Sequence, residues 1–323
     1  MSSDGLWDLQ PPTIPRRSHL FHLEPIGIGT PYVESLTSYI ARLADAHSVS
    51  VGTLIALEIK KNRLKKESYY GSNCPNINRI YSQNHIASLN GTHSGVKQLV
   101  AALTELTLQD NLQFLTLLTW AEVFPIIKLL KPYFAWCPHC YQEWRSRGTV
   151  IYSPLLWSIQ VVTVCPSHHQ PLLTFCPHCQ QQFLPLWSKT RPGYCLRCHG
   201  WLGSKNSSSS SNGSGLKDSQ RWEIWVANTL GELLEKAICF SSPPPRDTIQ
   251  KAIKAYTNRL TKGNISALSR FIGINRYQFI RWHNGVSIPI LSDLVKICYS
   301  LSTSLVDFLQ VEFSTRNLEN LAL

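Results

Sequence analysis

Four short motifs decide how this chain folds: CPHC (137–140), CPSH (165–168), CPHC (176–179) and CLRC (195–198). Each motif offers two metal donors from one tight turn, and together they supply seven thiols and one imidazole. That is the donor count of two tetrahedral zinc sites, and the spacing of the last two motifs is that of a zinc ribbon. The predicted ligands of two structural zinc ions are Cys137, Cys140, Cys165, His168, Cys176, Cys179, Cys195 and Cys198.

Two pairings of the motifs satisfy this count. Sequential pairing joins the first motif with the second and the third with the fourth, whereas crossed pairing joins the first with the third and the second with the fourth. Short loops close with a smaller loss of entropy, which favours sequential pairing. His169 is an alternative to His168, but the C-x-x-H step of His168 mirrors the other motifs. We interpret His139, His178 and His199 as bystanders.

Disulfides and a catalytic zinc are the alternatives to structural zinc. The start of the chain, MSSDGLWDLQPPTIPRR, lacks the apolar stretch of a signal peptide, so we expect a reducing, cytoplasmic setting. Cys74, Cys239 and Cys298 are then read as reduced thiols. Catalytic zinc usually leaves one position to water, whereas each predicted site has four protein donors, so the metals are expected to be structural.

Composition points to an anionic partner. The formal net charge is +11, hydrophobic residues make up 43% of the 323 residues and charged residues 16%. The excess of positive charge favours nucleic acid as a partner, with solubility alone as the alternative. No apolar run is long enough to span a bilayer, so no membrane association is expected.

The N-terminal part predicts two short helices. Apolar residues recur at helical spacing after Glu34, and a second helix is expected over Val51–Ile59 with its N-cap in the turn that ends at Ser50. Such a pair fits a helix-turn-helix, although any helical hairpin looks alike. A basic run follows, typical of phosphate contacts or of a solvated helix end: Lys60, Lys61, Arg63, Lys65 and Lys66.

Further elements are expected on either side of the cysteine motifs. Apolar spacing returns between Val96 and Trp120 and predicts core helices, with a short helix near Asn76–Tyr81 before them. The alternating stretch 152–173 predicts short strands or a hairpin. Tryptophans crowd the cysteine motifs and are expected to supply their core, with base stacking as the alternative: Trp136, Trp144, Trp157, Trp187 and Trp201.

The C-terminal part predicts a second helix-turn-helix, after a helix over Trp222–Cys239. Ile265–Ile272 would be its first helix, Gly273 its turn, and Asn275 the N-cap of the recognition helix, with Gln278 completing a capping box. Gly285 would end that helix, and covering helices follow over 291–301 and 304–309.

The exposed face of this recognition helix is a candidate DNA-reading surface. Its predicted contacts are Arg276, Tyr277, Gln278 and Arg281. Arginine can read guanine and glutamine can read adenine in the major groove, whereas Phe279 and Trp282 would face inward. Ile280 near the same side is compatible with thymine methyl groups or with docking onto protein.

The predicted fold class is mainly α-helical with small zinc-ribbon β elements, a helix-turn-helix at each end and a double zinc module between them. The expected boundaries are an extended arm over 1–30, an N-terminal helical domain over 31–132, a tandem zinc-ribbon module over 133–202, a Ser/Gly linker over 203–219 and a C-terminal helical domain over 220–323.

These segments together resemble a known family. VESLTSYIARLADAHSVSVGTL (33–54), LTW, WCPHC, PLLW, VCPSHHQPLL, FCPHC and CLRC follow in an order similar to that of TniQ/TnsD transposon target-selection proteins, over about residues 22–202. The resemblance carries over the eight metal ligands named above and makes the pair Glu34–Ile59 the N-terminal helix-turn-helix. The C-terminal segment is similar to phage-repressor (XRE) domains.

The resemblance implies a non-enzymatic adaptor. Members of this family mark an insertion site and recruit the AAA+ ATPase TnsC, and in CRISPR-associated transposons TniQ docks on a guide-RNA effector, Cascade or a Cas12-like protein. TnsD-type relatives bind an attachment sequence themselves; the length of this chain favours the RNA-guided type. The chain lacks a GxxxxGK[ST] motif, so the ATPase itself is excluded. A zinc-containing helix-turn-helix transcription factor and an enzyme with a zinc-bound water remain as alternatives, and a homodimer is compatible with each of these functions.

Overall fold

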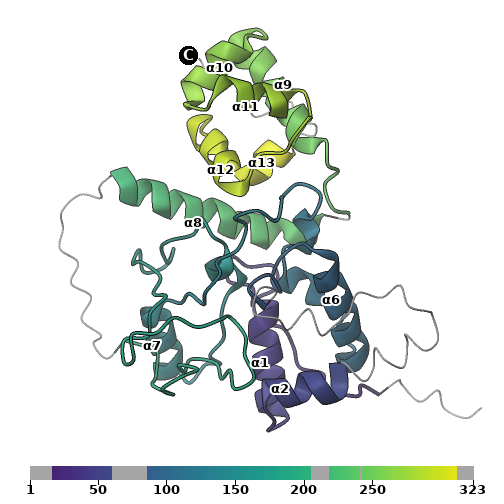
Figure 1. The fold of residues 1–323 in the computed structure, drawn as a ribbon, viewed down its shortest axis with the longest axis vertical. Coiled ribbons are helices and arrows are strands. Elements are labelled where there is room, and N and C mark those ends of the chain that lie inside the picture. Colours follow the sequence, from purple (N-terminus) through teal and green to yellow (C-terminus); the bar gives the residue numbers. More distant parts are fainter. Residues whose placement is uncertain (1–16, 60–85, 205–217, 241, 311–323) are drawn as a thin grey trace, which may run out of the picture.

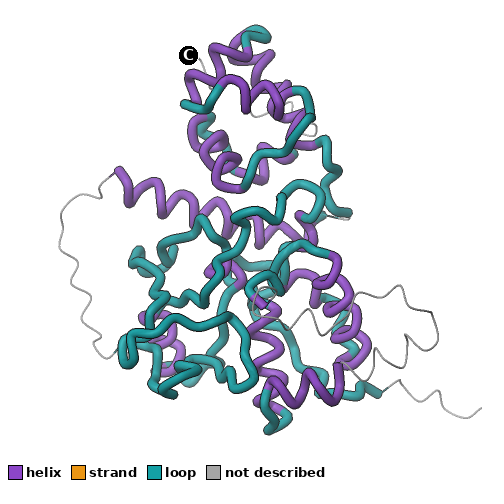
Figure 2. The backbone as a smooth tube through the Cα atoms, in the orientation of Figure 1, coloured by secondary structure: helices purple, strands orange, loops and turns teal. Residues whose placement is uncertain are grey.

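A computed structural model describes residues 17–59, 86–204, 218–240 and 242–310. Helices dominate the described chain, and its β structure consists of isolated bridges, so the predicted mainly α fold class is confirmed (Figure 2). In the stretch 152–173, where strands were expected, the structure has a 3-10 helix and single bridges such as Val164 with Pro171. Its backbone bonds instead to several separate segments: the N–H of Leu155 donates to Val33, and the N–H of Gln160 donates to Leu129.

The N-terminal helices follow the predicted boundaries. Helix α1 spans Leu36–Ala46, α2 spans Val51–Leu54, and a π-helical turn, η1, continues over Ile55–Ile59. Ser35 and Ser50 cap α1 and α2 by accepting hydrogen bonds from backbone N–H groups three residues on.

Helix α6 (Ser94–Thr107) and the 3-10 helices η2 (Leu112–Leu115) and η3 (Leu118–Trp120) complete the N-terminal part. Residues of α1, α2, α6 and η2 bury one hydrophobic core between them. Leu186, from the loop between the third and fourth cysteine motifs, belongs to the same core, and Gly52 of α2 donates its N–H to the carbonyl of Ser188. The cysteine-rich segment is therefore packed against the N-terminal helices.

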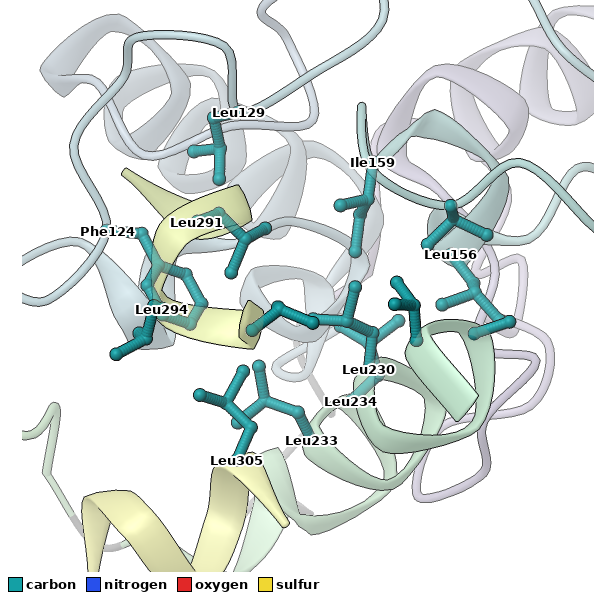
Figure 3. Packing of buried hydrophobic residues seen from close by; sticks show 14 of the residues in the cluster. Phe124, Leu129, Leu156, Ile159, Leu230, Leu233, Leu234, Leu291, Leu294 and Leu305 are labelled. Atoms are coloured by element: carbon teal, nitrogen blue, oxygen red, sulfur yellow. The ribbon is translucent and has the colours of Figure 1, made fainter. Parts of the chain in front are cut away.

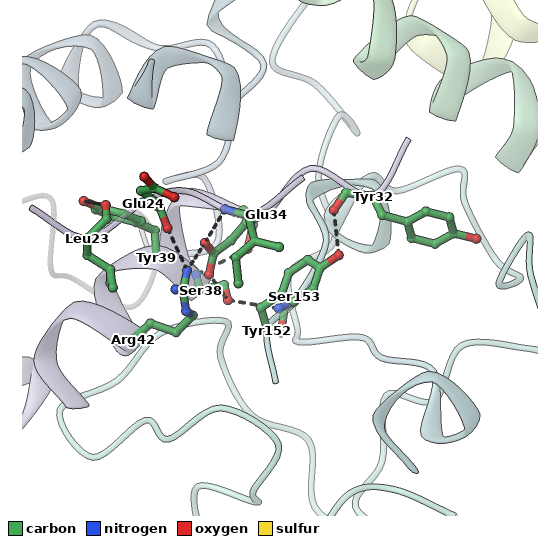
Figure 4. A network of polar contacts seen from close by, with 11 residues as sticks. Leu23, Glu24, Tyr32, Glu34, Ser38, Tyr39, Arg42, Tyr152 and Ser153 are labelled. Carbon is green, nitrogen blue, oxygen red and sulfur yellow. Dashed lines mark hydrogen bonds and ion pairs between the residues drawn. The ribbon is translucent and has the colours of Figure 1, made fainter. Parts of the chain in front are cut away.

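A buried polar network joins α1 to the segment after the first cysteine motif (Figure 4). The carboxylate of Glu34, which is fully buried, accepts hydrogen bonds from the guanidinium of Arg42 at 2.5 Å and from the hydroxyl of Ser38 at 2.8 Å. The N–H of Ser153 donates to the same Ser38 hydroxyl at 2.9 Å, and the carbonyl of Ser153 accepts from the N–H of Ser35. These contacts fix the central segment, residues 133–202, on the N-terminus of α1.

Lys131 holds a loop of the central segment in place. Its ammonium group donates to the backbone carbonyls of Trp157, Ile159 and Val162 at 3.0, 2.6 and 2.5 Å. The backbone beside it pairs with the same loop, since the N–H of Lys131 donates to the carbonyl of Ser158. Three carbonyls satisfy all three donors of a charged ammonium, so this half-buried side chain leaves no N–H group without an acceptor.

In the C-terminal part, the regular secondary structure of residues 218–240 and 242–310 is helical. Its helices, given with the structure's bounds, are α8 (Asp218–Lys236), α9 (Thr248–Thr261), α10 (Ile265–Ile272), α11 (Arg276–His283), α12 (Leu291–Ser300) and α13 (Leu305–Leu309), with the 3-10 turn η5 (Ala237–Cys239) after α8. Helix α9 was not predicted, although Ile249, Ala252, Ile253 and Tyr256 recur at helical spacing and are buried. The other helices agree with the predicted segments to within a few residues.

Helix α8 lies between the other C-terminal helices and the rest of the chain (Figure 1). On one side, Leu230 and Leu234 pack near Leu156 and Ile159 of the central segment, and on another, Leu233 packs near Leu305 of α13 (Figure 3). A single hydrophobic core therefore runs from the cysteine-rich segment through α8 into the C-terminal helices.

Among the described residues, no single helix is long and apolar enough to cross a membrane, and only the pair Leu36–Ala46 and Val51–Ile59, bent by 96°, meets the test of length and composition when taken together.

Candidate metal centre

The first cluster brings together the donors of the first two cysteine motifs: Cys137, Cys140, Cys165 and His168. Nδ1 of His168 lies 3.6 Å from Sγ of Cys137, 3.3 Å from Sγ of Cys140 and 3.6 Å from Sγ of Cys165. The sulfurs of Cys140 and Cys165 are 3.6 Å apart. The grouping follows sequential pairing, and it uses His168 rather than His169.

The second cluster contains the thiols of the third and fourth motifs: Cys176, Cys179, Cys195 and Cys198. The sulfurs of Cys176 and Cys198 are 3.7 Å apart, as are those of Cys179 and Cys195. It is the more exposed of the two, because Cys198 lies at the surface, whereas all three cysteines of the first cluster are buried.

These distances match the edges of a zinc tetrahedron. With a Zn–S bond of about 2.3 Å and a Zn–N bond of about 2.0 Å, tetrahedral geometry places two sulfurs about 3.8 Å apart and a sulfur and a nitrogen about 3.5 Å apart. A disulfide would need about 2.0 Å between sulfurs, and every described cysteine is free. The donor sets therefore fit a tetrahedral metal, and four protein donors at each cluster leave no ligand position for water.

Three of the four motifs share one backbone turn. In each, the N–H of the residue after the motif donates to the carbonyl of the first cysteine, and that residue has a positive φ. The three residues are His169, Gln180 and His199, with φ of 51°, 54° and 57°. Backbone N–H groups inside the motifs also point at sulfur, for example from His178 to Cys176 at 3.4 Å. Such donors stabilise thiolate charge, as a metal site requires.

The first motif is different, because it opens a helix. Cys137 is the N-cap of α7 (Pro138–Ser146), and Pro138 occupies the first helical position, where its missing N–H costs nothing. The sequence analysis did not predict α7, although the proline after Cys137 was a usable signal. The helix places Glu143 beside the cluster, with its carboxylate 3.6 Å from Nε2 of His168. A carboxylate on the far nitrogen orients a metal-binding histidine and makes it more basic.

Crowding of the thiols shifts their pKa values in opposite directions. Hydrogen bonding to Cys137 and Cys165, followed by burial, raises the pKa of Cys140. Hydrogen bonds from Cys137 and Cys140 lower the pKa of Cys165. A cation between the three thiols would favour the ionised form of each of them.

Aromatic side chains provide the packing that the two clusters lack. Trp136 and Trp157 are buried, and the indole N–H of Trp136 donates to the carbonyl of Leu202 at 3.0 Å. Tyr141 of α7 contacts the rings of Trp157 and Trp201. The predicted core role of the tryptophans is confirmed for these residues, whereas Trp187 is 39% exposed.

The three bystander histidines lie outside both clusters of donors. His178 has a structural role, since its Nε2 lies 2.8 Å from the carbonyl of Trp201. His139 stacks on His168 with ring centroids 5.4 Å apart. Neither contributes a donor atom to a cluster.

The predicted nucleic-acid contacts of the C-terminal part are exposed residues of one short helix. Arg276, Tyr277, Gln278 and Arg281 are all exposed on α11, whereas Phe279 and Trp282 are buried. Asn275 caps α11 by accepting from the N–H groups of Tyr277 and Gln278, and Gly273 has the expected positive φ. The side chain of Gln278 donates to the carboxylate of Asp293 at 3.4 Å instead of reaching back to the N–H of Asn275, so the predicted capping box does not form.

The predicted basic run Lys60, Lys61, Arg63, Lys65 and Lys66 and the short helix near Asn76–Tyr81 lie outside the described residues. The buried ion pair between Arg42 and Glu34 was not predicted from the sequence. The spacing did not signal this pair, because Glu34 precedes α1 and residues eight apart on a helix lie about 80° apart around its axis.

Comparison with known proteins gives one family. Residues 25–172 match the model of the TniQ family. No curated protein matches the chain. The matched range contains α1, α2, α6, α7 and all four donors of the first cluster, whereas the second cluster and the C-terminal helices lie outside it.

Proposed function

Because this chain carries a TniQ domain over residues 25–172, we propose that it is a non-enzymatic adaptor that selects the target site for DNA transposition. The family match is the observation that carries the proposal, since the TniQ domain is associated with transposition. The metal clusters support it, because four protein donors at each cluster suit a structural ion and leave no site for a reactive water.

In this role the eight donors would hold two structural zinc ions. Each ion would join two motifs that are separated in sequence, and the resulting module would keep the N-terminal helices, α7 and the loop at 186–188 in one arrangement. Zinc sites of this kind supply folding free energy directly, so removal of the metal would unfold the module rather than switch off a reaction.

The proposed partners are a guide-RNA effector complex and the ATPase TnsC. In this scheme the chain links a CRISPR effector such as Cascade or a Cas12-like protein to TnsC, and TnsC brings in the transposase. The positive net charge of +11 suits a protein that works beside DNA and guide RNA.

A second candidate is favoured by the exposed face of α11. Two arginines, a glutamine and a tyrosine project from one short helix that is capped and held by a buried aromatic pair. That arrangement suits entry into a major groove. On this alternative the chain binds its own attachment sequence, as TnsD-type proteins do, or acts as a zinc-containing transcription factor.

Co-purification separates these candidates. The chain is expressed with the genes that neighbour it, and its complexes are isolated with and without DNase and RNase. An RNA-guided adaptor should retain a guide-RNA complex after DNase but lose it after RNase. A protein that retains one specific duplex and no RNA selects its own site. Recovery of neither partner, with an intact fold, would contradict both.

A further inference from the structure

An open cavity of about 600 Å³ lies where α8 meets the turn between α12 and α13. No function proposed above uses this surface. Its described lining residues are Trp225, Asn228, Thr229, Glu232, Tyr299, Ser302, Thr303 and Ser304.

The cavity has an aromatic wall. The rings of Trp222 and Trp225 stack along α8, with centroids 6.0 Å apart. Tyr299 of α12 meets both rings nearly at right angles, at 4.9 and 5.0 Å. Tyr299 is 43% exposed, so this group of rings borders solvent instead of being covered by other elements. The faces of aromatic rings carry negative potential and attract cations.

A carboxylate lines the same cavity as the rings of Trp225 and Tyr299. Glu232, two turns after Trp225 on the same helix, lines the cavity and is half-buried. Burial, followed by the charge of Asp307, raises the pKa of Glu232, whereas Lys236 acts in the opposite direction. Although the chain carries a net charge of +11, the described lining contains one carboxylate and no basic side chain. A cation in the cavity would relieve the repulsion between the two carboxylates.

The base of the cavity is fixed by internal hydrogen bonds. Thr229 accepts from the N–H of Leu305 at 3.1 Å, which ties α8 to the start of α13. Ser304 caps α13 by accepting from the N–H of Asp307, and Thr303 accepts from the hydroxyl of Tyr256. These bonds fix α8 against the start of α13, so the cavity is formed before any ligand arrives, which lowers the entropy cost of binding.

We propose that this cavity binds an arginine side chain presented by a protein partner. A planar guanidinium can stack on the ring of Trp225 or Tyr299 while it donates to the carboxylate of Glu232. Nucleic acid does not fit the same surface, because its phosphates would meet the carboxylate of Glu232 in a lining without basic side chains. The inference is independent of the role in transposition, so it can stand or fall separately.

Fluorescence anisotropy with a labelled arginine–glycine repeat peptide tests the proposal on the full chain. The matched probe replaces each arginine by citrulline, which keeps the shape and removes the charge. We expect the citrulline peptide to bind at least roughly tenfold more weakly. Glu232→Gln should weaken arginine-peptide binding by about fivefold or more, and Trp225→Ala should act in the same direction.

Two further variants test whether binding depends on this cavity and not on the general charge of α8. Glu235→Gln makes the same charge change on the same helix outside the described lining and should leave binding unchanged. Asn228→Arg places a guanidinium one turn from Glu232 and should block the probe while retaining the fold. Equal binding of both peptides, equal losses in Glu232→Gln and Glu235→Gln, or full binding by a folded Glu232→Gln chain would each overturn the proposal.

Discussion

The carboxylate of Glu34 and the guanidinium of Arg42 lie 2.5 Å apart, and the side chain of Glu34 is fully excluded from water. Helix α1, which carries Ser38 and Arg42, is thereby joined to Ser153, because Ser38 donates to Glu34 and accepts from the N–H of Ser153. One ion pair thus connects the first helix to the segment that carries the metal clusters.

Loss of one partner of this pair should be costly. Glu34→Gln leaves Arg42 with little solvent and no counter-charge, so the free energy of unfolding should fall by about 3 to 5 kcal/mol. The double variant Glu34→Gln/Arg42→Met should lose less than the sum of the two single changes. Urea unfolding measures both. The matched control is Asp247→Asn, which breaks an exposed pair with Lys251 and should change stability by less than about 0.5 kcal/mol. Equal losses at both pairs would contradict the buried role.

The buried ammonium of Lys131 should make stability depend on pH. Burial lowers the pKa of Lys131 from 10.5 to about 7. Below pH 7 both folded and unfolded chains carry this proton; between pH 7 and 10.5 only the unfolded chain keeps it, so the free energy of unfolding should rise with pH. Relative to Lys131→Met, the wild-type chain should gain up to about 2 to 3 kcal/mol between pH 7 and 9. Urea unfolding over this pH range measures the difference. If the wild-type chain and Lys131→Met gave parallel profiles, the prediction would be wrong, and the three carbonyls would keep the ammonium charged in the folded chain.

Metal analysis should give about two zinc ions per chain. Cys140→Ser should reduce this to about one and unfold the segment around α7, because the remaining donors can no longer complete the tetrahedron. Cys239→Ser, which removes an exposed thiol outside both clusters, is the matched control and should keep both ions. Elemental analysis and circular dichroism, with and without chelator, measure the outcome. A chain that stays folded after complete metal removal would contradict the structural role.

Two glycines with positive φ should respond differently to alanine. A Cβ at Gly193 would lie 2.5 Å from the ring of Trp201 and 2.9 Å from Ile151, whereas a Cβ at Gly148 would meet nothing within 4 Å. Gly193→Ala should therefore destabilise the chain by about 2 to 4 kcal/mol, from overpacking and backbone strain together. Gly148→Ala carries only the strain, about 1 kcal/mol. Thermal unfolding of the two variants compares them directly. Similar losses of stability would mean that the ring of Trp201 moves aside to accommodate the added methyl group.

The exposed face of α11 can be tested by removing its charges. If it contacts DNA, alanine at Arg276, Gln278 and Arg281 should weaken duplex binding at least roughly tenfold and reduce its salt dependence. Lys254→Ala/Arg259→Ala removes the same charge from exposed positions on α9 and serves as the control. Electrophoretic mobility shifts over a salt series report both effects. Unchanged binding in the triple variant would leave α11 as a protein-docking surface.

Local patterns in the sequence were sufficient to predict the metal clusters and most helices. The C-x-x-C and C-x-x-H spacings predicted which donors meet, because a tight turn fixes two ligands at once. Ser50, Gly273 and Asn275 marked helix ends for a similar reason, since caps and positive-φ turns act within a few residues. The clusters and helix boundaries could thus be derived from neighbouring residues alone.

Long-range polar contacts could not be predicted in this way. Lys131 read as one more basic residue, yet its partners lie 26 to 31 residues further along the chain. Helices α7 and α9 were missed because the first was read only as a cysteine motif and the second only as a connection. The cavity at Glu232 lies between α8 and the end of α12, which are distant in sequence, so no local pattern predicts it.

The position of α8 has a consequence for chain continuity. This helix is buried on one side against Leu156 and Ile159 and on another against Leu305, so the contacts that hold the two parts together are made by side chains on both sides of residues 205–217. A polypeptide ending at residue 204 and a second one beginning at residue 218 should therefore assemble when they are co-expressed. The protein would tolerate being split there, and a reporter divided between the two fragments would record its assembly in cells.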